Sequence, residues 1–318
     1  MYNFFKKKFF YLSIIIFIFS SLNLSFASQE IKIIKKIDSR IITNIDIINE
    51  YNYLIALNND LKNIKKEEGI KIAEESLSRE IIKLNEIEKY QLIEKFDQTA
   101  IIEKIVTDFY LKLNISDIQE FEVYLNQFNV SLNGVKNKIK IEILWNQLIG
   151  SKFKDQINID IPKLKKKIKK ENLDINNFIE YDLSEIVFQI SNQEEYNQKL
   201  QKIISSIKSE GFNISANRFS VSNTSQFGGK IGKIKESQLS KLIKDELNKI
   251  EIGQFTPPIK VANGFLILLI NNKQTITSKV NEEDLLNNMI EYEQNQQFEK
   301  FSQIYYNKIK LNTLIDEE

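Results

Sequence analysis

The sequence predicts an α+β fold, with a mainly helical N-terminal domain, one small α/β domain and a C-terminal helix. The first observation is the distribution of chain breakers, because six of the nine glycines and two of the three prolines lie between residues 176 and 273. The second is the spacing of apolar residues between residues 47 and 170, where they recur every three or four positions, as on one face of a helix. Two architectures are therefore expected in this chain of 318 residues.

Residues 1–27 are predicted to be a signal peptide. Three lysines precede an apolar run over residues 9–19, and a small-x-small site ends at Ala27. We expect cleavage before Ser28, export to a bacterial periplasm, and no stable membrane insertion afterwards. The alternative is an uncleaved anchor, although the run is short for a membrane span of about 20 residues. Because the chain has no cysteine, a lipid-modified N-terminus is excluded.

The helical N-terminal domain is predicted to span residues 28–175. It begins with a hairpin over residues 30–46, which leads into a helix capped at Thr43 or Asn44. Four or five helices follow, with apolar stripes over residues 70–84, 101–109, 118–128 and 132–143, and with N-caps expected at Ser116 or Asp117 and at Ser131. The stripes are interpreted as packed core; alternatively, some of these faces stay open as a groove for extended partners.

The α/β domain is predicted to span residues 176–275, in the order β-α-α-β-α-β-β. A strand over residues 183–190 precedes helices over residues 194–208 and 212–219, a glycine-rich turn at residues 228–232, a helix over residues 237–249 and a hairpin arm over residues 259–269. Residues 281–313 are expected to form a C-terminal helix that returns to pack on the N-terminal domain. Its predicted apolar side consists of Leu285, Met289, Tyr292, Phe298, Phe301, Ile304 and Tyr305.

The composition restricts the catalytic and metal-binding groups that the protein can use, because the chain has neither histidine nor cysteine. Ser-His-Asp and Cys-His nucleophiles, zinc sites built from these residues and iron–sulfur clusters are excluded. The net charge of +1 argues against a nucleic-acid-binding protein. No phosphate-binding or calcium-binding spacing occurs, so neither a cofactor nor a metal is expected. The lysine-rich residues 163–170 either bind anionic lipid or acidic chains, or form the solvated face of a helix. We favour the second, because Glu171 and Asp174 follow and no aromatic residue lies between the lysines.

The α/β domain resembles the parvulin-type (PpiC) peptidyl-prolyl isomerases, also called rotamases. Five blocks match in order and at the family's spacing: residues 185–188, 212–220, 228–232, 252–259 and 263–267. The remainder resembles the SurA-like periplasmic chaperones, through the opening strand and the Ile-Thr-x-x-Asp helix start at residues 42–46 and through the order of domains. Better-known members carry two parvulin modules, whereas this chain has room for one.

The resemblance implies a pocket with altered residues. Glu185 and Leu266 occupy the family's two histidine positions, and Ser222 occupies its Cys or Asp position. The implied substrate-binding residues are Ile231, Leu239, Ile243, Phe255 and Asn263. An isomerase lowers the X-Pro rotation barrier of about 18–20 kcal/mol by holding a twisted amide in a pre-polarised pocket. Without both imidazoles that hydrogen-bond network is lost, so we expect catalysis to be weak or absent and regard the first three residues as degenerate catalytic positions.

Two functions from different classes follow. The first is a periplasmic chaperone that binds unfolded segments, outer-membrane protein precursors among them, and carries a weak or inactive isomerase domain. The alternative is an active isomerase that assists the folding of exported proteins, in which Ser222, Asn263 and backbone groups polarise the amide. A third interpretation is an exported helical scaffold with a degenerate α/β insert.

Overall fold

A computed structural model describes residues 30–93, 97–170, 177–190, 192–261, 264–277 and 282–317. The predicted signal peptide lies outside the described residues. Residues Ile33–Glu318 form one compact unit. Within this unit we call residues 33–170 the helical region and residues 177–277 the sheet region. The predicted domain boundaries stay predictions.

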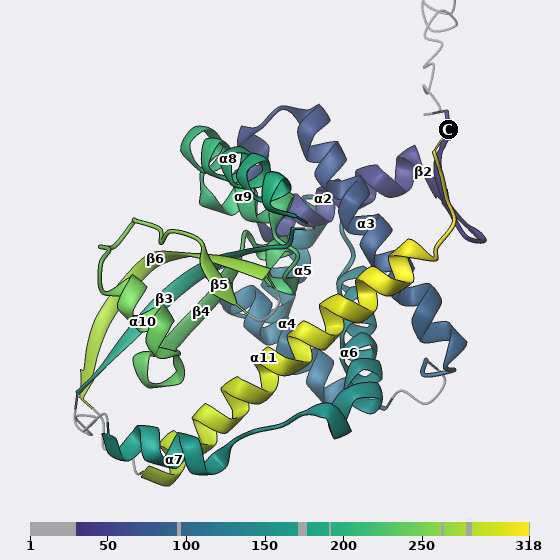
Figure 1. Ribbon diagram of the computed structural model, residues 1–318. Helices are drawn as coiled ribbons and strands as arrows, with labels where there is room; N and C mark the ends of the chain where they lie inside the picture. The colour runs from purple at the N-terminus through teal and green to yellow at the C-terminus, as the bar shows by residue number, and fades with distance from the viewer. Residues whose placement is uncertain are drawn as a thin grey trace, which may run out of the picture. The chain divides into compact units, whose positions relative to one another are not determined.

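The helical region opens with the predicted hairpin, β1 (Ile33–Ile37) and β2 (Arg40–Thr43), followed by α2 (Asn44–Leu57). The predicted cap at Thr43 is confirmed, because its hydroxyl accepts from the Asp46 amide at 3.3 Å and the Asp46 carboxylate accepts from the Thr43 amide at 2.8 Å. A strand that the sequence analysis did not predict, β7 (Ile315–Glu317), pairs antiparallel with β1. The sheet order is therefore β2-β1-β7, and the C-terminal strand closes onto the first one (Figure 1).

Helices make up the rest of this region, and the N-caps predicted at Asp117 and Ser131 are confirmed. The elements are η1 (Asn59–Asn63), α3 (Lys66–Lys89), α4 (Thr99–Lys112), α5 (Ile118–Asn126), α6 (Leu132–Phe153), η2 (Lys154–Gln156) and α7 (Ile161–Lys170). Their apolar stripes pack into a core that includes Leu54, Phe121 and Leu125. In the lysine-rich α7, Leu164 and Ile168 are buried while Lys163, Lys165 and Lys166 are exposed, as expected of a solvated helix face.

The sheet region has the predicted element order, and its four strands form an antiparallel sheet in the order β4-β3-β6-β5. The elements are β3 (Asn177–Phe188), α8 (Gln193–Glu210), α9 (Phe212–Phe219), η3 (Asn223–Phe227), β4 (Lys230–Lys235), η4 (Glu236–Gln238), α10 (Lys241–Leu247), β5 (Ile259–Val261) and β6 (Gly264–Thr277). β3 begins earlier than predicted because it pairs with β6 along its whole length, from Asn177 opposite Thr277 to Phe188 opposite Phe265. The predicted α+β class is confirmed.

The last helix, α11 (Glu282–Leu311), contacts α3, α6 and α7 of the helical region and η4 of the sheet region (yellow in Figure 1). The indole of Trp145 on α6 donates to the Ser302 hydroxyl at 2.8 Å. The prediction that Ile304 belongs to the apolar side is wrong, because it is 53% exposed. Two residues correspond to about 200° of helical rotation, so Ile304 points away when Ser302 faces Trp145. No helix within the described ranges is long and apolar enough to cross a membrane.

Candidate functional site

Four of the predicted pocket residues lie together on one face of the larger sheet. Leu266 on β6 lies opposite Val187 of β3 and Ile259 of β5. Leu239 and Ile243 are buried against the same cluster, and Ile231 packs on it half-buried. Leu266 is itself only 7% exposed, and an isobutyl group cannot donate a hydrogen bond. Leu266 is therefore part of a packed apolar cluster and places no polar group at that position.

The structure does not bring Phe255 to this face. Its backbone bridges to Leu269, and its ring packs 6.5 Å from that of Phe212 in the cluster formed with α8 and α9. Asn263 lies outside the described residues. The sequence motif identifies the chain position of Phe255, but the side of the sheet on which its ring packs depends on the pairing with β6.

Glu185 and Ser222, two of the predicted degenerate positions, are in direct contact. Glu185 on β3 accepts hydrogen bonds from the Ser222 hydroxyl at 2.7 Å and from the Thr224 hydroxyl at 2.9 Å. Sequence analysis missed Thr224, because a threonine in a polar loop has no distinguishing pattern. The glycine-rich turn fixes the strand beside them: Gly229 has φ +78°, and a Cβ there would lie 2.2 Å from the Glu185 carbonyl oxygen.

Burial raises the pKa of the Glu185 carboxyl above its ordinary value of 4.5, although the hydrogen bonds from Ser222 and Thr224 oppose the rise. The negative charge of Glu299 on α11 raises the pKa further. The pKa of Glu299 is also raised by burial, while Lys83 opposes this and Glu142 adds to it. The site thus contains a carboxyl that two hydroxyls hold in place where the resemblance implies an imidazole. Both hydroxyls donate to the same carboxylate oxygen, Oε1, so this carboxyl is already hydrogen-bonded within the protein.

The loop that carries Ser222 and Thr224 is anchored in the helical region. Phe227 at its end packs edge-on against Phe109 of α4, with ring centroids 4.4 Å apart. The Tyr53 hydroxyl donates to the Gln226 side chain at 3.2 Å, and the Lys83 ammonium donates to Asn223 at 3.2 Å. Sequence analysis assigned no element to this segment and missed Phe227. The helical region therefore holds the loop that positions the hydroxyls on Glu185.

A cleft of about 850 Å³ opens where the helical region, the sheet region and α11 meet. α3 contributes Arg79 to its lining, the sheet region contributes Phe219 and Val221, and α11 contributes Tyr306 and Lys310. The sequence analysis interpreted the apolar helical stripes as packed core, with an open groove as the alternative, and the structure shows a packed core there. A cleft between segments far apart in the chain has no signature in local periodicity.

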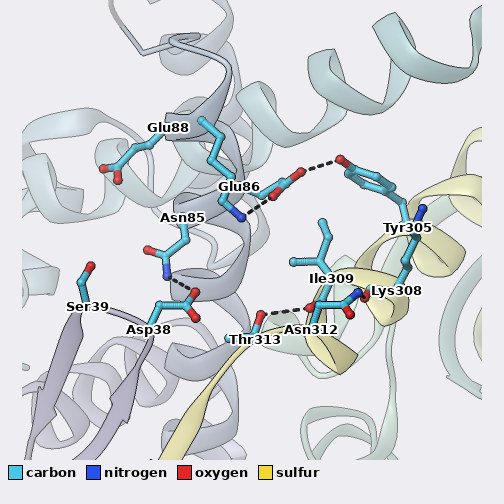
Figure 2. A pocket seen from close by; sticks show the side chains of 11 residues that line it. Asp38, Ser39, Asn85, Glu86, Glu88, Tyr305, Lys308, Ile309, Asn312 and Thr313 are labelled. Carbon is cyan, nitrogen blue, oxygen red and sulfur yellow. Dashed lines mark hydrogen bonds and ion pairs between the residues drawn. The ribbon is translucent and has the colours of Figure 1, made fainter.

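A second cavity, of about 630 Å³, lies at the C-terminal end of α11 and is mainly polar (Figure 2). The Tyr305 hydroxyl donates to the Glu86 carboxylate at 2.5 Å, and the Asn85 amide donates to the Asp38 carboxylate at 3.3 Å. These contacts tie the end of α11 to α3 and α3 to the β1–β2 turn. In the part of the chain that the structure describes, no group of three acidic side chains converges as a metal site would require.

Comparison with known proteins agrees with the predicted resemblance. The family model "Rotamase: PPIC-type PPIASE domain" matches residues 184–272, from within β3 to within β6. Chaperone SurA of Hydrogenovibrio crunogenus (strain DSM 25203 / XCL-2) is 24% identical over 219 residues. The chain is SurA-like and carries a PpiC-type domain. The match covers 67% of this chain but only 43% of that chaperone, so the chain spans less than half of the length of its curated relative.

Two solved structures are also similar. One comes from work describing PEB4 and Cj1289 of Campylobacter jejuni as SurA-like chaperones. It is 16% identical, covers 90% of this chain and 98% of its own, and has a TM-score of 0.35. The other is a PpiC-type peptidyl-prolyl cis-trans isomerase domain that is 27% identical, covers 32% of this chain and 96% of its own, and has a TM-score of 0.28.

Proposed function

We propose that this protein is a periplasmic chaperone, exported through residues 1–27, that binds extended segments of unfolded polypeptides, outer-membrane protein precursors among them. The observation that carries the proposal is the cleft of about 850 Å³ at the junction of the helical region, the sheet region and α11. Binding sites occur preferentially as concave surfaces between structural units. The similarity to Chaperone SurA supports the same function.

We infer that the PpiC-type domain catalyses prolyl isomerisation weakly or not at all. Leu266 offers no hydrogen bond at one position where the family carries histidine, and it is buried among other apolar residues. At the other position Glu185 already accepts from Ser222 and Thr224, so its carboxyl is committed to the protein's own hydroxyls. The domain then contributes to client binding through its part of the cleft, which includes Phe219 and Val221.

The chaperone function is tested by aggregation. An outer-membrane β-barrel protein is diluted from urea with and without a several-fold excess of the purified protein, and light scattering is followed. Suppression of scattering is the expected result. An unchanged scattering curve at every excess would refute the chaperone proposal.

Isomerase activity is tested separately with a protease-coupled assay on an X-Pro tetrapeptide. We expect a rate close to the uncatalysed one, and the Glu185→Gln variant should not differ from the wild type. A wild-type rate comparable to that of ordinary parvulins would instead establish the alternative function, an active isomerase.

A further inference from the structure

We call the cleft of about 850 Å³ the junction cleft, and more cationic side chains than carboxylates line it. Its lining includes six cationic side chains, Lys35, Arg79, Lys83, Lys199, Arg218 and Lys310, but only three carboxylates, Glu75, Glu195 and Glu317. Four of the cations are compensated by ion pairs, for example Lys83 with Glu142 at 2.8 Å and Arg218 with Glu210 at 2.6 Å. These pairs neutralise their cations, so the charge that the lining can offer to a ligand comes from the two remaining cations, Arg79 and Lys310.

Among the residues that the structure describes, two of these cations form no ion pair, although Glu75 lies one helical turn before Arg79 in the same lining. None of the ion pairs among the described residues involves Arg79 or Lys310. Arg79 hydrogen-bonds the Tyr306 hydroxyl, which accepts only part of the donor capacity of a guanidinium. Arg79 is on α3 and bonds Tyr306 of α11, about one helical turn before Lys310, and both cations line the cleft. A guanidinium can form two parallel hydrogen bonds to one carboxylate (bidentate binding), so Arg79 should bind a carboxylate more strongly than Lys310 does.

Apolar side chains complete the lining. They come from all three parts of the structure and are Ile82, Ile190, Phe219, Val221, Leu311 and Ile315. A ligand that satisfies both features carries carboxylates next to apolar side chains along an extended backbone. We propose that the junction cleft selects polypeptide segments in which Asp or Glu alternates with aromatic or aliphatic residues, with Arg79 and Lys310 binding the carboxylates. This inference rests on the proposed chaperone function and adds the class of segment that the cleft takes.

The test uses three fluorescent peptides with identical aromatic and aliphatic residues. They differ at two positions, which carry Glu, Gln or Lys, and their affinities for the purified protein are measured by fluorescence anisotropy. We expect the Glu peptide to bind about three- to fivefold more tightly than the Gln peptide for each carboxylate, as for a single partly exposed ion pair. The Lys peptide should bind most weakly, and added salt should reduce the difference between the Glu and Gln peptides.

The variants Arg79→Gln and Lys310→Gln should each remove part of the preference for the Glu peptide, and the double variant should remove it. Affinity for the Gln peptide should fall much less than affinity for the Glu peptide, which separates charge recognition from damage to the fold. Lys104→Gln, an exposed lysine on α4 outside the cleft, is the matched control and should bind like the wild type.

Equal affinities for the Glu and Gln peptides, or equal losses for both peptides in the double variant, would overturn the inference while leaving the chaperone function intact. Failure to bind any of the three peptides, together with unsuppressed aggregation, would refute the proposed function as well.

Discussion

The two sides of α11 make different kinds of contact, aromatic packing on one side and amide hydrogen bonds on the other. Towards the helical region it presents rings: Phe301 stacks on Phe153 of α6 with centroids 4.9 Å apart, and Tyr305 lies 5.9 Å from Trp145. Towards the sheet region it presents amides, since Gln303 donates to the Val221 carbonyl at 2.8 Å and Asn307 to Gln189 at 2.7 Å. The C-terminal helix is therefore part of the core of the helical region, although it is almost the last element in the chain.

The direct contact between the helical and sheet regions resembles the second side of α11. Asn58 donates to Asn217 at 2.5 Å, Asn213 donates to Asp60 at 2.6 Å, and Phe227 provides an aromatic anchor. Polar groups of this kind also hydrogen-bond well to water, so their net contribution to stability is modest. The comparison teaches that apolar packing determines which elements unfold together, while polar contacts fix only how the sheet region is attached.

The largest expected effect comes from the aromatic side of α11. Trp145→Ala should lower the free energy of unfolding by about 3–5 kcal/mol, because it removes a fully buried ring and leaves the Ser302 hydroxyl without its donor. Urea unfolding followed by circular dichroism measures the change. Ile304→Ala, on the exposed side of the same helix, is the matched control and should cost no more than about 0.5 kcal/mol. Similar losses for the two variants would contradict the comparison.

A smaller effect is expected at the aromatic anchor of the sheet region. Phe227→Ala should cost about 2 kcal/mol, since the ring is only half-buried. The loss should be local, so amide hydrogen exchange should quicken in η3 and β4 but not in α6 or α11. Phe227→Leu should recover most of the protection. Uniformly faster exchange in all helices would show that the two regions share one cooperative core.

How far the sequence predicted this arrangement depends on how local each signal is. The caps at Thr43 and at Ser131 involve neighbouring residues, and both are found in the structure. β7 was missed because its partner β1 lies at the other end of the chain. The ring of Phe227 was missed because one aromatic residue in a polar loop produces no periodicity.

In the candidate site, too, features that depend on contacts between distant segments were missed. The resemblance placed Glu185 and Ser222 in one pocket, and their hydroxyl–carboxylate hydrogen bond brings them together. Phe255 also lies in one of the matching blocks, but its ring packs on the other face of the sheet. The cations Arg79 and Lys310 were not singled out, because a charge surplus in the cleft arises only when α3 and α11 meet. The side of the sheet on which Phe255 packs and the charge of the cleft depend on contacts between distant segments. Local sequence patterns do not predict these contacts.

The carboxyls between α11 and the sheet region should make stability depend on pH. Glu185 and Glu299 have raised pKa values in the folded state, so their protonation stabilises the fold. That contribution is fully present below the ordinary pKa of 4.5 and is lost as pH rises through the raised values. It amounts to about 1.4 kcal/mol for each tenfold change in proton affinity.

The measurement compares the free energy of unfolding of the wild type with that of Glu185→Gln/Glu299→Gln at about pH 5 and about pH 8. The wild type should lose stability relative to the double variant as pH rises. Glu291→Gln, an exposed carboxyl on the same helix, should leave the pH profile unchanged. Parallel profiles for the wild type and the double variant would show that these two carboxyls do not titrate within the contact.

The smallest effect is expected from a single polar contact between the two regions. Asn213→Ala removes the hydrogen bond to Asp60 and should cost about 1 kcal/mol, since Asp60 regains water when the amide is lost. Asn197→Ala, on the exposed surface of α8, is the matched control, and urea unfolding distinguishes the two. A loss as large as that of Trp145→Ala would mean that the polar contact is desolvated and as strong as the aromatic packing. A loss near 1 kcal/mol would instead mean that the sheet region is attached by contacts that water can replace one at a time.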